Sequence, residues 1–277
     1  MTELTTGPIA ILGAGNVGQA LARGLLGTKG VRAADITLTR RHAEKLAELA
    51  STGFGISTDN CAAVEKARQI VVAVQPSQLD GLLVEIRDAL DPKRHALISV
   101  VTGVTIGQIQ ARVGVELPIV RAMPNTAIAI GQSMTCLAAS HAHREALARA
   151  QALFDSVGTT LEIDESMMES ATALCACGVA FFLRSIRAAS QGGIEIGFHP
   201  DEALQMAAQT ARGAASLLIR DGSHPESEID RVTTPRGCTI AGLNEMEHRG
   251  FSSAMIKGIV TSAQKAVELY RPVNRQP

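Results

Sequence analysis

Apolar and polar positions along the chain form two different patterns, one before and one after Asp164. Before it, short apolar runs alternate with segments of helical spacing, such as Ala20, Leu21 and Leu25 after the run Ile9–Leu12. A nearly continuous apolar run is typical of a parallel strand covered on both faces. The alternation of strand and helix with short links therefore predicts an α/β domain with a doubly wound parallel sheet. Further strands are expected at 36–39, 54–57, 69–74, 96–101, 118–123, about 134–138 and 160–163.

After Asp164 the pattern is helical almost throughout and rich in Ala and Gly. One long helix is expected from 167 to about 190, weakened locally by Gly178, and the last helix from 252 to 270 carries one apolar face. Aromatic residues make up only 3% of the chain, so these helices have few large side chains with which to fill a core of their own. We therefore predict two domains, 1–164 and an all-α domain 165–277 that completes its core by dimerising.

Charge and cysteine content exclude several classes of partner. The 277 residues carry 26 basic and 27 acidic side chains, a net charge of −1, and this balance argues against a nucleic-acid partner. The five cysteines are odd in number and show no metal-ligand spacing, which favours a reduced cytoplasmic protein without a metal site. No signal-peptide core precedes the first strand, and the longest apolar run, 173–183, is too short to span a bilayer. We therefore expect neither secretion nor a membrane partner.

The glycine motif Gly13-Ala14-Gly15-Asn16-Val17-Gly18 follows the first strand directly. Gly13 suits a tight turn, Gly15 lets the backbone approach a pyrophosphate, and Gly18 lets the helix pack against the strand. The helix that starts here offers free amides and a partial positive charge to phosphate groups. The motif predicts a dinucleotide-binding domain; the alternative is a glycine turn in an ordinary α/β domain.

The residues after the second strand bear on the choice of cofactor. An enzyme that uses NAD usually places an acid here for the ribose hydroxyl, but 36–43 contains none. Thr39, Arg40 and Arg41 instead suit a 2′-phosphate, because guanidinium groups bind phosphate in a bidentate manner. NADP(H) is therefore preferred, with NAD(H) possible, unless both arginines are simply exposed at a helix start. The end of the fourth strand, Val74-Gln75-Pro76, is expected to lie over the cofactor.

Two further segments carry side chains of chemical interest. The loop Arg121-Ala122-Met123-Pro124-Asn125-Thr126 follows the sixth strand, where it either contributes to the active site or only turns the chain into the next strand. Cys175 and Cys177 lie two apart on the predicted long helix and should diverge, so we interpret them as small packing residues.

The stretch 230–243, DRVTTPRGCTIAGL, resembles the signature of the pyrroline-5-carboxylate reductases. The loop 121–126 and the glycine motif are similar to that family too, and the match runs collinearly from about residue 8 to 270. The resemblance implies a Rossmann domain and a helical dimerisation domain, in which NAD(P)H reduces a cyclic imine to L-proline, the final step of proline biosynthesis. It also implies an intertwined homodimer, sometimes assembled into a decamer of five dimers.

The resemblance also assigns roles to individual residues. Thr239 matches the threonine whose hydroxyl contacts the ring nitrogen of the substrate, although a helix N-cap is its alternative role. The amides of Gly237, Cys238 and Thr239 match the substrate-carboxylate loop, which Thr234 opens. The expected cofactor-binding residues are Gly13, Gly15, Asn16, Val17, Gly18, Thr39, Arg40, Arg41, Val74, Gln75, Pro76 and, lining the nicotinamide, Met123, Pro124 and Asn125.

Three stretches depart from the family pattern. Cys175-Ala176-Cys177-Gly178-Val179-Ala180 stands where the family usually has Ser-Gly-Ser-Gly-Pro-Ala, Arg236-Gly237 replaces Gly-Gly, and Gln75-Pro76 replaces Lys-Pro. Two other functions therefore stay open. One is a related reductase acting on another cyclic imine or a 2-oxo acid, and the other is a non-catalytic NADP-binding regulatory protein.

Overall fold

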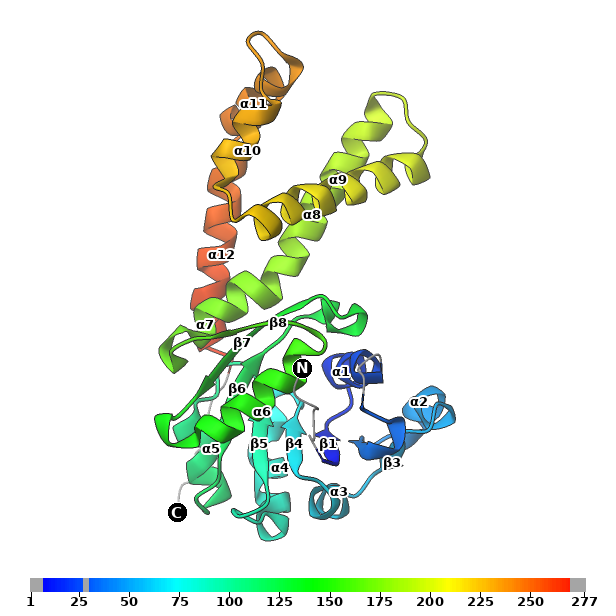
Figure 1. Cartoon of the computed structure of the whole chain (residues 1–277), viewed down its shortest axis with the longest axis vertical. Helices are drawn as coiled ribbons and strands as arrows, with labels where there is room; N and C mark the ends of the chain where they lie inside the picture. The colour runs from blue at the N-terminus through cyan, green and yellow to red at the C-terminus, as the bar shows by residue number, and fades with distance from the viewer. Residues whose placement is uncertain (1–6, 27–29, 270–277) are drawn as a thin grey trace. The chain divides into compact units, whose positions relative to one another are not determined.

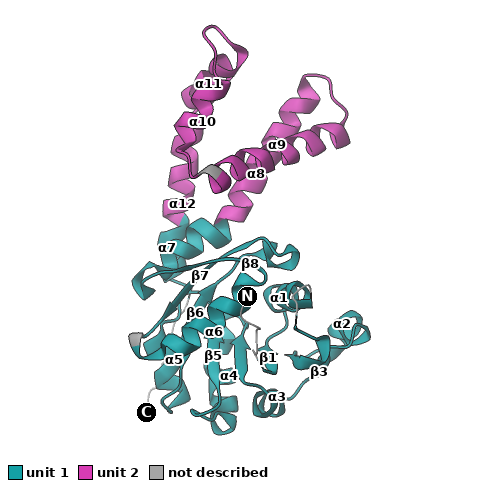
Figure 2. Ribbon diagram, viewed as in Figure 1, with its two compact units in different colours: residues 1–177, 262–277 teal, residues 178–261 magenta. Residues whose placement is uncertain are grey.

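The computed structural model describes residues 7–26 and 30–269. They form two compact units (Figure 2), one made of residues up to 177 together with those from 262 onward, and the other of residues 178–261. The predicted domain boundary after residue 164 stays a prediction. The predicted end of the last helix at Tyr270 lies outside the described residues.

An eight-stranded sheet organises the first unit (Figure 1), with strand order β3-β2-β1-β4-β5-β6-β7-β8. The pairings from β3 across to β6 are all parallel, with Ile9 opposite Ile36 on one side and Gln69 on the other. The strands are β1 (Ile9–Leu12), β2 (Ile36–Thr39), β3 (Gly55–Ser57), β4 (Gln69–Val72), β5 (Ala96–Ser99), β6 (Ile119–Met123), β7 (Ser133–Ala139) and β8 (Gly158–Glu162).

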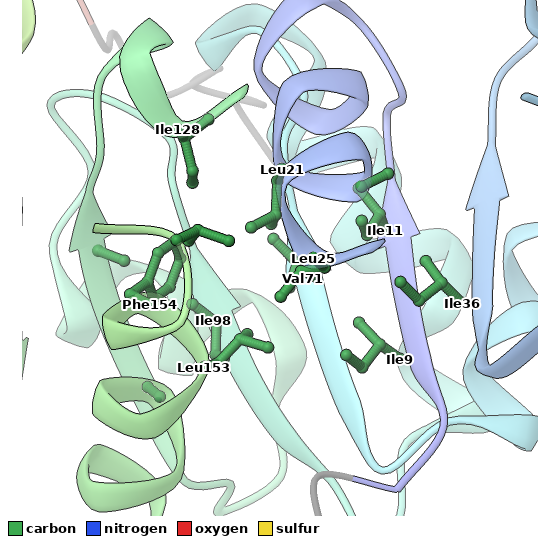
Figure 3. Close-up of a cluster of buried hydrophobic side chains, with 14 of the residues drawn as sticks. Ile9, Ile11, Leu21, Leu25, Ile36, Val71, Ile98, Ile128, Leu153 and Phe154 are labelled. Atoms are coloured by element: carbon green, nitrogen blue, oxygen red, sulfur yellow. The ribbon is translucent and has the colours of Figure 1, made fainter. Parts of the chain in front are cut away.

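Helices cover both faces of this sheet, as a doubly wound fold requires. Alternate residues of β1 enter separate cores: Ile9 and Ile11 pack with Phe154 (Figure 3), whereas Ala10 and Leu12 pack in a second cluster. The predicted α/β class is confirmed. The helices of this part are α1 (Asn16–Leu26), α2 (Ala47–Ser51), α3 (Asn60–Lys66), α4 (Pro76–Ile86), α5 (Ile106–Val113) and α6 (Arg144–Asp155), with short 3-10 helices η1 (Ala33–Asp35), η2 (Ala43–Leu46), η3 (Arg87–Ala89) and η5 (His141–His143).

The sheet is not parallel throughout, because β7 runs antiparallel to β6. The link between them holds a single 3-10 helix, η4 (Thr126–Ile130), which is too short for the crossover that a parallel neighbour needs. Strand β8 then pairs with β7 in parallel, after the crossover through α6.

The predicted long helix is present but is not regular. After η6 (Glu165–Met167), α7 (Met168–Ala171) leads into a π-helix, η7 (Thr172–Cys177), and then into α8 (Gly178–Glu195). The Thr172 hydroxyl donates to the Met168 carbonyl at 2.9 Å, which gives that carbonyl a side-chain donor at the point where the helix widens. The structure thus places the irregularity before Gly178, one turn earlier than the expected weak point.

The second unit is entirely helical. It contains α8, α9 (Pro200–Asp221), α10 (Pro225–Val232), α11 (Cys238–His248) and the first part of α12 (Phe251–Val267). Large apolar side chains remain exposed on these helices, including Phe182, Ile219 and Ile256. Within the described residues, the helical stretch Glu165–Glu195 is long and apolar enough to cross a membrane, judged by length and composition only. This stretch is longer than the apolar run 173–183 noted in the sequence, because a helix of this kind can include a few charged residues between its apolar ones.

Candidate cofactor and substrate site

The glycine turn between β1 and α1 has the geometry that a dinucleotide requires. Gly13 has a φ of +89°, and a Cβ there would lie 2.5 Å from the Val74 side chain. A Cβ on Gly18 would approach Ile11 at 3.1 Å, whereas a Cβ on Gly15 would meet no atom within 4 Å. Gly13 and Gly18 are thus required for packing, and the backbone at Gly15 faces open space that a ligand can enter.

A cavity of about 750 Å³ lies at this edge of the sheet, close to the carboxyl ends of the first strands. It brings together half of the predicted cofactor residues. These are Gly13, Gly15, Thr39, Arg40, Arg41, Val74 and Gln75. The other predicted residues near it, Asn16, Val17, Gly18 and Pro76, belong to the first turns of α1 and α4 but are not part of the cavity lining.

Two neighbouring arginines, Arg40 and Arg41, make one part of the cavity lining basic. The Arg40 guanidinium donates from Nη1 to the Ala14 carbonyl at 3.2 Å, so it lies against the glycine turn, and Arg41 beside it is exposed. The Thr39 side chain is buried, and its hydroxyl donates to Asn60 Oδ1 at 2.6 Å. Thr39 therefore contributes to the lining with its hydroxyl already engaged.

Sequence reasoning missed Asn60 and Glu85, which also line the cavity. Asn60 accepts from Thr39 and donates from Nδ2 to Glu85 Oε1 at 3.0 Å, so the three side chains form one chain of hydrogen bonds. The signal for Asn60 was its place shortly after the third strand, because carboxyl ends of parallel strands meet at one edge. No comparable signal marks Glu85, which faces the cavity from the last turn of α4.

The loop after β6 does not line this cavity. Met123 is buried against Cys136 and Met168, and Pro124 is buried as well. Asn125 caps η4 by accepting from the Ala127 amide at 3.0 Å, and its Nδ2 donates to the Cys175 carbonyl at 3.2 Å. The turn-forming role of this loop is thus realised, and its contact with a nicotinamide stays a prediction.

A buried arginine of the same motif was also missed. The side chain of Arg121 is only 3% exposed and pairs with Glu165 at 3.3 Å and Glu169 at 3.0 Å. Glu165 also accepts from the Ile106 amide, at the start of α5. Arg121 therefore joins β6 to the beginning of the long helix, a role that only tertiary structure reveals.

The signature stretch in the second unit forms a tight turn followed by α11. The Gly237 amide donates to the Thr234 carbonyl at 2.9 Å, and Arg236 has a φ of +63°, as expected for the third position of a type II turn after Pro235. A Cβ on Gly237 would lie 2.5 Å from the Thr234 hydroxyl, so only glycine fits there.

Gly237 is the N-cap of α11, which places Thr239 at the second helical position. The alternative role of Thr239 as a helix N-cap is therefore wrong, because the helix begins two residues earlier than a cap at Thr239 requires. Of the three amides predicted to hold a carboxylate, that of Gly237 is already engaged with Thr234. Those of Cys238 and Thr239 lie in the first turn, where amides have no partner within the helix and where no acidic residue competes.

No group of three or more His, Cys, Asp or Glu side chains among the described residues is arranged to hold a metal ion.

Comparison with known proteins identifies the family. Residues 165–269 match the family model described as pyrroline-5-carboxylate reductase dimerisation, and residues 8–103 match the one described as NADP oxidoreductase, coenzyme F420-dependent. Pyrroline-5-carboxylate reductase 2 of Dictyostelium discoideum is 47% identical over 283 residues, which cover 96% of this chain and 94% of that protein. The chain belongs to the pyrroline-5-carboxylate reductase family.

Other reductases extend the comparison. Pyrroline-5-carboxylate reductase 1 of the same organism is 50% identical over 274 residues, which cover 95% of this chain and 50% of that protein, so the chain spans about half its length. A crystal structure of Plasmodium falciparum pyrroline carboxylate reductase, with NADP bound, superposes with a TM-score of 0.86 at 23% identity, covering 95% of this chain and 98% of that one. The resemblance inferred from the signature is confirmed, and the reductase fold extends over nearly the whole chain.

The dimerisation match also bears on the apolar helices. It covers the exposed apolar side chains of α8 and α9 and all of the stretch of membrane-crossing length. Those side chains thus belong to the segment whose family model is described as a dimerisation domain.

Proposed function

We propose that this chain reduces 1-pyrroline-5-carboxylate to L-proline with NADPH, by hydride transfer to the cyclic imine, as the final step of proline biosynthesis. The observation that carries the proposal is the glycine turn and its cavity, a built dinucleotide cradle in a chain of the pyrroline-5-carboxylate reductase family.

The residues of the cradle fit NADP(H). Gly15 leaves room for the pyrophosphate at the start of α1, and Asn16, Val17 and Gly18 follow it there. Arg40 and Arg41 supply positive charge for a 2′-phosphate, so NADP(H) is preferred while NAD(H) remains a usable cofactor. Val74 and Gln75 follow β4 and Pro76 begins α4. We assign Met123, Pro124 and Asn125 to the nicotinamide side of the bound cofactor. When bound, the reduced nicotinamide supplies the hydride.

The protein's own task is to hold and orient the imine. The amides of Cys238 and Thr239 bind its carboxylate, because successive N–H groups at a helix start attract an anion. The Thr239 hydroxyl hydrogen-bonds the ring nitrogen as it becomes an amine, while Thr234 and Gly237 shape the turn that presents these groups. No acid–base dyad is required, because a protonated C=N bond is already electrophilic.

The functional form is a homodimer, with five dimers joining into a decamer, in the cytoplasm. Exposed large apolar side chains on α8, α9 and α12 support self-association, because association of two copies would remove them from water.

An NADPH oxidation assay tests the proposed activity directly. Turnover with 1-pyrroline-5-carboxylate is expected to exceed turnover with other cyclic imines and with 2-oxo acids. Preference for another compound of the panel would replace the substrate and keep the reaction class. Binding of NADPH without turnover of any compound would instead identify a regulatory protein.

A further inference from the structure

Two cysteine side chains from distant parts of the sequence meet inside the first unit. Cys136 lies on β7 and Cys175 in the π-helix η7, and their sulfur atoms are 3.8 Å apart. Both are free thiols. The interpretation of Cys175 as a simple packing residue is therefore incomplete, because its sulfur faces another sulfur rather than carbon alone.

The surroundings give the two thiols unequal access to reagents. Cys136 is 3% exposed, in a cluster with Met123 and Met168, whereas Cys175 is partly exposed. A small molecule from solvent therefore reaches Cys175 first. Cys136 has almost no exposed surface of its own.

The more accessible thiol, Cys175, is also the more acidic of the two. The hydrogen bond from the Cys136 thiol lowers the pKa of Cys175 to about 7, against the opposing effect of burial. The same hydrogen bond, together with burial, raises the pKa of Cys136. Near neutral pH, Cys175 is thus partly ionised to the thiolate while Cys136 keeps its proton, which suits Cys175 as an attacking thiol and Cys136 as a resolving one.

The backbone at Cys175 can follow a closer approach of the two sulfurs. A π-helical turn is wound more loosely than an α-helical one, with hydrogen bonds from residue i to i+5. A shift of Cys175 towards β7 therefore changes one loose turn and leaves α7 and α8 intact.

We propose that Cys136 and Cys175 form a reversible disulfide by exchange with a small disulfide such as oxidised glutathione. The Cys175 thiolate attacks one sulfur of glutathione disulfide, which forms a mixed disulfide and releases one glutathione thiolate. Cys136 then gives up its proton and attacks the Cys175 sulfur, which releases the second glutathione. The two protein thiols are oxidised by two electrons, and one glutathione disulfide is reduced to two glutathione molecules.

The bond would join β7 to η7 beside the loop after β6. Asn125 donates to the Cys175 carbonyl, so any shift of Cys175 is passed to the residue that caps η4.

Peptide mapping of the intact, reduced protein tests the proposal. The protein is incubated with glutathione disulfide near neutral pH, quenched with acid, alkylated and digested, and the peptides are identified by mass spectrometry. The expected product links the peptide of Cys136 to that of Cys175, with a mass two hydrogen atoms below the sum, and dithiothreitol reverses the link. This measurement uses the wild-type protein, so its outcome does not depend on whether a variant folds.

Two variants separate the steps. Cys136→Ser should stop the reaction at a mixed disulfide between Cys175 and glutathione. Cys177→Ser, two residues from Cys175 and outside the pair, should form the link to the same extent as the wild type. Recovery of Cys175 from the wild-type protein only as a free thiol or as a lasting glutathione adduct, with Cys136 reduced, would overturn the proposal.

Discussion

At the residue scale, Arg236 adopts a left-handed backbone conformation that is unfavourable for a residue with a side chain. Among the described residues it is the one non-glycine with a positive φ, and its place in the turn favours glycine. A left-handed conformation costs an L-residue roughly 1–2 kcal/mol. The chain therefore retains an arginine against a backbone preference, beside the amides assigned to the substrate carboxylate.

Thr239→Val tests the hydroxyl assigned to the ring nitrogen. Valine keeps the shape of the side chain and removes a hydrogen bond worth roughly 0.5–1.5 kcal/mol, more with a charged partner. Turnover with 1-pyrroline-5-carboxylate should therefore fall about threefold to a hundredfold, at about 1.4 kcal/mol per decade, with NADPH affinity unchanged.

The control for Thr239→Val is the thermal midpoint of the same protein. Because Gly237 is the N-cap of α11, the substitution removes no helix cap, and the midpoint should stay close to that of the wild type. Unchanged turnover would leave orientation of the imine to the carboxylate-binding amides alone.

Arg40→Ala combined with Arg41→Ala tests the assignment of the 2′-phosphate. Loss of a charge-assisted hydrogen bond costs about 1.5–3 kcal/mol, so the Kd for NADPH should rise at least tenfold and that for NADH far less. Titration by fluorescence or calorimetry measures both constants. Equal losses for the two cofactors would show that these arginines do not recognise the phosphate.

At the scale of elements, Arg121 joins three of them: β6, the start of α5 through Glu165, and α7 through Glu169. Arg121→Ala leaves two partly exposed carboxylates without their buried cation, so the loss of unfolding free energy should stay below the roughly 3–5 kcal/mol of a fully buried pair. Urea unfolding of the purified protein measures it.

Glu169→Gln is the matched control for Arg121→Ala. It removes one charge of the cluster but leaves a carbonyl oxygen that accepts from Arg121, so it should cost clearly less. Equal and small losses for both variants would mean that the ion pairs contribute little to the junction.

Elements with a strong local pattern were predictable. Strands β1 and β2 begin and end where expected, because an apolar run bounded by turn residues defines a buried strand without tertiary information. The glycine turn and the arginines after the second strand followed from the same local reasoning, because the spacing of the glycines and the absence of an acid at 36–43 can be recognised from the sequence alone. The antiparallel direction of β7 and the π-helix η7 were not predictable in this way, because neither has a periodicity of its own.

Contacts that depend on tertiary packing escaped prediction. Asn60 matters because it accepts from Thr39, and Cys175 because β7 brings Cys136 to it. In both cases the residues are adjacent only after the sheet has formed. The cap of α11 was misplaced for a different reason: a glycine without a side-chain cap ends the turn, so the usual preference for threonine had no effect.

At the scale of the whole molecule, self-association should depend on the apolar helices of residues 165–269. Ile219 on α9 is 85% exposed, and Ile219→Asp should raise the dimer dissociation constant at least tenfold, because each substitution occurs twice in a symmetric interface. Ile130→Asp, at a side chain 76% exposed outside that segment, is the control and should leave the constant unchanged. Sedimentation velocity at several concentrations distinguishes the two, and equal behaviour would place the interface elsewhere.

The stability of the chain should fall on mild acidification because of His95. This buried side chain accepts from the Asp91 amide at 2.9 Å, and burial, followed by the charge of Arg94, lowers its pKa. The unfolded chain then binds a proton that the folded chain does not, so the stabilisation is complete above the unfolded pKa of about 6.5 and declines as pH falls towards the folded value.

Urea unfolding at about pH 7.5 and about pH 5.5 measures this dependence on either side of the unfolded pKa. His95→Asn, whose Oδ1 replaces Nδ1 as the acceptor, should lose less stability between the two than the wild type. If His95→Asn lost as much unfolding free energy between the two pH values as the wild type, the acid sensitivity would come from other groups.

The division of the chain into units has a consequence for its synthesis. The helical unit, 178–261, is an insertion, since the chain returns to the first unit from residue 262 and buries Ala266 there. A ribosome adds roughly 5–20 residues per second, so the nascent first unit waits several seconds for its final segment, the end of α12, to emerge. During that interval the surface later covered by the end of α12 is open, and a chaperone has its opportunity to bind. An early stop codon a few residues before Ala266 would therefore leave the first unit without its last segment, although most of that unit was translated first.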